Sequence, residues 1–109
     1  MAKKRIPEKV KKIVWEYAYR LAEEEKLPIE KVIIFGSHAK GEARKWSDID
    51  VCIISSRFKD PMRALTFLLQ KRTREEAREG LEPVGFTRKN FETDSALVEE
   101  IKKTGVVLR

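Results

Sequence analysis

Two aspartates separated by a single residue are the side chains whose type and spacing best suit metal chemistry. Side chains alternate between the faces of a β-strand, so Asp48 and Asp50 would project from one face, about 7 Å apart. Carboxylates are hard oxygen ligands, and Mg²⁺ typically binds one or two of them together with substrate phosphates. The alternative is an exposed strand start with two unrelated acids, because buried unpaired charges are costly.

A glycine–serine pair upstream of the aspartates favours phosphate binding. The apolar run 32–35 predicts a short buried strand that Gly36 ends, and Ser37 is placed to cap a short helix over 37–43. A helix N-terminus offers free N–H groups and the positive end of the helix dipole to anions. A simple serine cap would explain Gly36 and Ser37 alone. The two features together match the needs of metal-assisted nucleotidyl transfer.

The segment 36–51 resembles the signature of the DNA-polymerase-β-like nucleotidyltransferases, and most closely that of their minimal nucleotidyltransferase (MNT) branch. The shared order is Gly-Ser, a small residue, Gly, a variable loop and then Ser-Asp-Ile-Asp. The segment 81–91 also resembles the third strand and following turn of that branch. The resemblance therefore covers most of the chain, and it implies one MNT domain over residues 1–109.

The resemblance implies a site with a metal-binding part and a nucleotide-binding part. The family places a third acid on its third strand, where it helps to hold the metal or acts as a base, and Glu82 matches it. Because the neighbouring Pro83 could turn Glu82 away, Glu79 and Glu92 are the alternatives. The implied Mg²⁺ ligands and catalytic residues are Asp48, Asp50 and Glu82. The implied nucleotide-binding residues are Gly36, Ser37, Ser47 and Lys40.

The loop before the aspartates allows two interpretations of each notable residue. Ser47 either contacts a phosphate or caps a turn. Lys40, Arg44 and Lys45 either neutralise triphosphate or contact an acceptor, or they form a solvated basic surface. Trp46 either stacks on a base or partner, or packs within the loop.

The resemblance also implies a partner and a reaction. MNT proteins are commonly paired with a HEPN-type helical protein, and some act as antitoxins that transfer AMP from ATP to a tyrosine of that toxin. We therefore expect a Mg²⁺-dependent nucleotidyltransferase with a protein acceptor. The alternative is a non-catalytic nucleotide-binding antitoxin that neutralises its partner by contact. A nucleic-acid acceptor is the weaker alternative, because no stacking platform or recognition helix accompanies the net charge of +6.

Composition is compatible with these expectations. Hydrophobic residues form 41% of the 109 residues, enough for a packed core in one domain. The net charge of +6 favours polyanionic partners such as nucleotides, although a solvated surface explains it equally well. Cys52 lies in an apolar run and is expected to be a small buried hydrophobe. No segment has the length of a membrane span or an apolar signal region, so we expect a cytoplasmic protein.

The apolar periodicity predicts how these residues are positioned. We expect helices over 7–26, 37–43, 61–79 and 94–104, and strands over 32–35, 48–54, 81–86 and 106–108. This order, αβαβαβα with a short final strand, indicates an α/β (α+β) fold with a short mixed sheet of three to four strands covered by helices.

Two helices have predicted apolar faces that bear on packing and assembly. The first helix presents Ile6, Val10, Ile13, Val14, Tyr17, Ala18 and Leu21, and the helix from Pro61 presents Met62, Leu65, Leu68 and Leu69. Trp15 and Tyr19 lie beside the first stripe and widen it. They either help the helix to cover the sheet or form an interface for a homo- or hetero-oligomer.

Overall fold

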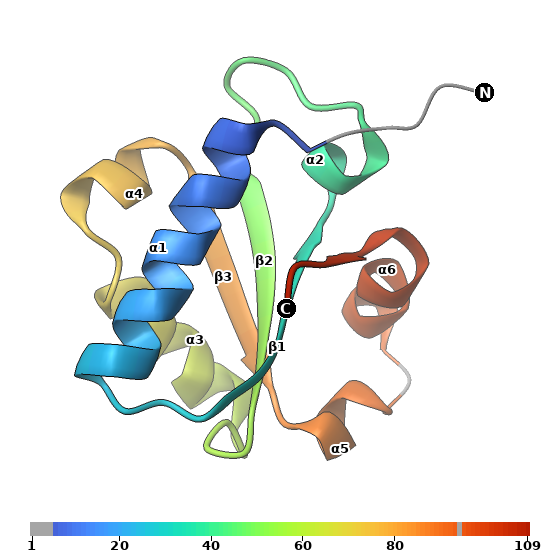
Figure 1. Cartoon of the computed structure of the whole chain (residues 1–109). Helices are drawn as coiled ribbons and strands as arrows, with labels where there is room; N and C mark the ends of the chain where they lie inside the picture. The colour runs from blue at the N-terminus through green and yellow to red at the C-terminus, as the bar shows by residue number, and fades with distance from the viewer. Residues whose placement is uncertain (1–5, 94) are drawn as a thin grey trace.

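A four-stranded mixed sheet forms the centre of the computed structural model, which describes residues 6–93 and 95–109 (Figure 1). Its strands are β1 (Ile29–Phe35), β2 (Ile49–Ser55), β3 (Leu81–Phe86) and β4 (Val106–Val107). They lie in the order β3-β2-β1-β4. β1 is antiparallel to both β2 and β4, whereas β2 and β3 are parallel. The predicted mixed sheet is confirmed, and β3, which contains Pro83, is an edge strand.

Six helices of the described residues cover this sheet. They are α1 (Glu8–Glu24), α2 (Ser37–Lys40), α3 (Pro61–Gln70), α4 (Arg74–Arg78), α5 (Arg88–Phe91) and α6 (Ala96–Thr104). Figure 1 shows α1, α3 and α4 on one side of the sheet and α5 and α6 on the other. The predicted α+β class is therefore confirmed. The predicted start of the last helix at Asp94 lies outside the described residues.

Strand alternation divides the core between the two faces of the sheet. Alternate residues of β1 and β2, including Ile34 and Val51, pack with α1 and α3 in the larger cluster. Their neighbours, including Cys52, pack with Ile101 of α6 in the smaller cluster. Cys52 is fully buried, and burial raises the pKa of its thiol to about 12, as expected of a small core hydrophobe.

The first helix buries almost all of its predicted apolar face. The residues of its stripe are buried apart from Ile13, which is partly buried and packs against the core. The Tyr17 hydroxyl donates to the Leu68 carbonyl oxygen of α3 at 2.6 Å, which ties the two helices together. Trp15 and Tyr19 are 41% and 65% exposed, so they do not help α1 to cover the sheet.

The helix predicted over 61–79 is in fact two helices, α3 and α4. The chain leaves the helix after Gln70, and Thr73 starts α4 with a capping box in which its hydroxyl accepts from the Glu76 N–H. Glu76 is buried and accepts two hydrogen bonds from Arg20 of α1. This tertiary ion pair fixes the break. Met62, predicted to be core, is 72% exposed because Ala64 and Leu68 form the buried face of α3.

Candidate active site

Strand register brings two of the three predicted carboxylates, Asp50 and Glu82, to one end and one face of the sheet, and Asp48 lies at the same end. Asp50 of β2 lies directly opposite Glu82 of β3 in the parallel pair. Ile49 and Leu81, the preceding residues of the two strands, face the larger core cluster, so Asp50 and Glu82 face the opposite side. Asp48 precedes β2 by one residue and adds to the same end. Figure 1 places this end of β2 near α2.

The pKa of Asp50 reflects its burial and the charges of the neighbouring carboxylates. The pKa of Asp50 is raised to about 6, first by burial and then by the charges of Asp48 and Glu82, while the charge of Lys40 opposes this rise. Asp50 is half-buried, whereas Asp48 and Glu82 are exposed. Among the described residues, none donates a hydrogen bond to these three carboxylates. Their oxygens are thus open to a cation.

Glycines allow the backbone to approach two of these carboxylates. Gly36, between β1 and α2, has φ 75° and ψ −151°, a conformation essentially restricted to glycine. A Cβ atom there would overlap the Asp50 carboxylate. Gly80, before β3, has φ 84°, and a Cβ on it would lie 3.1 Å from Oδ1 of Asp48. The turn at Gly36 therefore places the start of α2 against Asp50.

The start of α2 supplies the predicted phosphate-binding elements. Ser37 is its first residue, and a helix leaves its first N–H groups without partners inside the helix. Lys40 ends α2, and its ammonium lies 3.6 Å from Glu100 of α6 and 3.8 Å from Glu42. Lys40 thus lies between the carboxylate cluster and two further acids. The ion pair of Lys40 with Glu100 joins α2 to α6, and no sequence pattern predicts it because the two residues are far apart in the chain.

Other predicted residues are placed differently. Ser47 occupies a turn, where its hydroxyl accepts from the Arg44 N–H at 2.7 Å and its own N–H donates to the Arg44 carbonyl. Glu79 follows α4 as its C-cap and pairs with Lys9 at 3.4 Å, and Glu92 follows α5. Glu82, rather than Glu79 or Glu92, lies opposite Asp50 in the register.

Two features near the site were not predicted to belong to it. Gly80 accepts a hydrogen bond from the Ile49 N–H at 2.8 Å, which aligns β2 and β3 just beyond their carboxylates. A glycine between a helix and a strand is the only sequence signal for it. His38 of α2 is buried, and its Nδ1 lacks a hydrogen-bond partner among the described residues.

The chemistry of the carboxylate cluster fits a hard divalent cation. No three His, Cys, Asp or Glu side chains converge at metal-binding distance in the described part of the chain. Mg²⁺, however, is usually bound by one or two carboxylates, with phosphates and water completing its shell. The open oxygens of Asp50 and its neighbours, whose charges repel one another, meet that requirement. The cluster can therefore supply one or two carboxylate ligands to Mg²⁺, and phosphate and water would complete the shell.

A small mixed sheet with carboxylates on adjacent strands beside a Gly-Ser turn defines a nucleotidyltransferase-type domain. The sequence profile of the nucleotidyltransferase domain matches residues 14–109, so this chain belongs to the nucleotidyltransferase domain family. This confirms the resemblance seen in the sequence. A search of curated proteins found no match. No helix of residues 6–93 and 95–109 is long and apolar enough to cross a membrane.

Two solved structures share the fold. One is a toxin–antitoxin crystal structure with AMP-PNP, with a TM-score of 0.56 and 19% identity over 86% of this chain and 71% of that chain. The other is a crystal structure of a candidate nucleotidyltransferase from Sulfolobus solfataricus, with a TM-score of 0.58 and 18% identity over 98% of this chain and 89% of that one. At these identities, the likeness is one of fold.

Proposed function

We propose that this domain transfers a nucleoside monophosphate, AMP from ATP, to a hydroxyl of a partner protein. The observation that carries the proposal is the cluster of Asp48, Asp50 and Glu82 beside the Gly36 turn. Family membership supports nucleotidyl transfer. The toxin–antitoxin neighbour solved with AMP-PNP supports an adenine nucleotide, and we propose that a HEPN-type toxin is the acceptor and this chain its antitoxin.

In this proposal, each part of the site acts on one part of the reaction. Ser37 and the free N–H groups of α2 bind the β- and γ-phosphates, and Lys40 offsets their charge. Asp48, Asp50 and Glu82 hold Mg²⁺, which neutralises charge on the triphosphate when it is bound. The acceptor oxygen bonds to the α-phosphorus, the bond to the β-phosphate oxygen breaks, and pyrophosphate leaves. The hydroxyl proton passes to the carboxylate cluster.

Labelling of the proposed acceptor, a HEPN-type protein encoded as the genomic neighbour of this chain, tests this proposal. The protein, Mg²⁺ and α-labelled ATP are incubated with that neighbour, and label on the neighbour is measured. We expect Asp48→Asn/Asp50→Asn to abolish labelling. Glu23→Gln/Glu99→Gln is the matched control, since it also replaces two carboxylates, both exposed, and should label normally. Equal labelling by both double variants would remove these aspartates from the reaction.

A second candidate function is neutralisation of the partner by contact alone. The exposed Trp15 and Tyr19 on α1 favour it, because such aromatics are enriched at protein interfaces. A tight complex that forms without any label, and that Trp15→Ala/Tyr19→Ala weakens, would support this function over transfer. A complex unaffected by both substitutions would exclude α1 as its interface.

A further inference from the structure

A hollow of about 490 Å³ lies far from the carboxylates, where the chain leaves β2 and enters α3. We call it the distal hollow. β2 has seven residues and separates the two regions by about 20 Å. The volume lies within the range of sites that bind organic groups. Figure 1 shows this turn at the opposite end of the sheet from α2, so an occupant would leave the carboxylates accessible.

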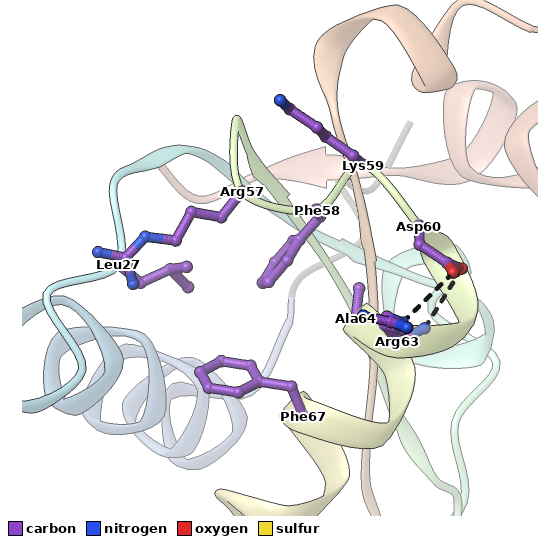
Figure 2. A pocket seen from close by; sticks show the side chains of 8 residues that line it. All are labelled: Leu27, Arg57, Phe58, Lys59, Asp60, Arg63, Ala64 and Phe67. Carbon is purple, nitrogen blue, oxygen red and sulfur yellow. Dashed lines mark hydrogen bonds and ion pairs between the residues drawn. The ribbon is translucent and has the colours of Figure 1, made fainter.

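The floor of the distal hollow is apolar and preformed. Leu27, Phe58 and Ala64 are each at most 5% exposed, and Phe67 completes the floor. The rings of Phe58 and Phe67 have centroids 6.2 Å apart and are tilted by 56°. Figure 2 shows both rings and the Leu27 side chain turned toward one open space. Phe58 also packs so closely on Gly85 that a Cβ there would overlap its ring.

The rim of the distal hollow is basic. Arg57, Lys59 and Arg63 surround the floor, with Asp60 as the one acid among the lining residues. Asp60 is already engaged, because its Oδ1 accepts from two N–H groups at the start of α3 and its Oδ2 lies 3.9 Å from Arg63. The Arg57 side chain donates one hydrogen bond, to the Glu25 carbonyl oxygen. The rim therefore keeps a net positive charge and open donor groups.

The distal hollow continues into a second hollow along the same end of the sheet. Lys59 lines both, and Glu30, Arg88 and Lys89 are the charged residues that line only the second. Arg88 is already paired with Glu30 at 2.7 Å, so Lys59 and Lys89 remain as the cations of the second hollow. Figure 2 shows Lys59 extending away from the phenylalanine rings, and the Asn90 side chain donates to the Lys59 carbonyl at 3.2 Å. The two hollows, which share Lys59, thus form a track suited to an extended ligand, with an apolar recess at one end and the cations of Lys59 and Lys89 beside it.

We propose that this track binds an extended acidic segment of a partner protein, with one apolar side chain seated over Phe58 and Phe67. Its carboxylates would contact Arg57, Lys59 and Arg63, which gives the apolar centre and charged rim typical of protein interfaces. A single-stranded nucleic acid fits less well, because base stacking needs the exposed face of a ring, and Phe58 is buried and Phe67 partly buried. An aliphatic side chain needs only an apolar surface to pack against. This site is independent of nucleotidyl transfer.

A defined peptide tests the proposal. A short fluorescein-labelled peptide, rich in glutamate with one central leucine, is titrated with the full chain, and anisotropy and ¹⁵N NMR shifts are followed. We expect shifts at Phe58 and Phe67. Lys59→Glu/Arg63→Glu should weaken binding about tenfold or more, since two favourable pairs become repulsive. Both positions are exposed, so the variant should fold, which circular dichroism verifies.

Matched controls make the result decisive. Lys12→Glu/Lys103→Glu makes the same charge change at exposed positions outside the track and should bind the peptide normally. A peptide with serine in place of leucine should bind severalfold more weakly. The proposal is overturned if the peptide does not bind, if both charge variants bind it equally, or if a single-stranded oligonucleotide displaces it from the same residues with higher affinity.

Discussion

Replacing Asp50 with asparagine is expected to stabilise the ligand-free domain at neutral pH. Burial and the neighbouring acids raise the pKa of Asp50 to about 6, from an unfolded value of 3.8. The folded protein therefore binds more protons than the unfolded chain between these values. Its stability falls as pH rises from 3.8 to about 6 and stays lowered above that range, because Asp50 is then charged in both states. Asparagine carries no such charge.

The size of the gain follows from the same shift. A change of about two pKa units corresponds to roughly 3 kcal/mol at most. The Asp50 side chain is only half-buried, so solvent screening reduces the expected gain to about 1 kcal/mol. In a domain of this size, that raises Tm by roughly 4 to 6 °C.

Urea unfolding of the wild type and Asp50→Asn measures this difference. The gain should be about 1 kcal/mol near pH 8 and close to zero near pH 4, where the penalty is nearly absent. Glu23→Gln, an exposed carboxylate on α1, is the matched control and should show little change at either pH. A variant less stable than the wild type near pH 8, or a gain of equal size at both pH values, would refute the reasoning.

Three further substitutions test how the fold supports the site. Gly36→Ala should lower the free energy of unfolding by more than about 2 kcal/mol, because it combines a glycine-only conformation with overlap on Asp50; a smaller loss in urea unfolding contradicts this. Glu76→Ala should lower the free energy of unfolding by roughly 3 kcal/mol, because it removes the carboxylate that pairs with Arg20. A double-mutant cycle with Arg20→Ala should show strong coupling between the two residues, and additive losses would show that the ion pair does not contribute. Tyr17→Phe should cost about 1 kcal/mol by removing the short hydrogen bond to the Leu68 carbonyl, which keeps only the 3.3 Å bond from the Lys71 N–H, and an unchanged Tm would show that the hydroxyl contributes nothing.

Much of the site was predictable because its signals are local. The alternation of a strand places Asp48 and Asp50 on one side of the chain, and the glycine at position 36 marks the turn before α2. The resemblance to the MNT branch then added Glu82, which strand alternation alone could not connect to the pair. The break between α3 and α4 was missed because residues 70–79 consist mostly of good helix formers, with no Pro or Gly before Gly80. The pair of Arg20 with Glu76, which supports the start of α4, joins distant segments and leaves no local signal.

The sequence by itself determined the class of fold, the nucleotidyltransferase family and the residue types of the candidate site, because these depend on local periodicity and a contiguous signature. Only the tertiary structure decided that Glu82 lies opposite Asp50, that Lys40 reaches α6, and that Ser47 caps a turn. It alone also revealed the distal hollow, whose floor joins Leu27 to residues of the β2–α3 turn and α3. Strand register and contacts between remote segments arise from packing, which no short stretch of sequence encodes.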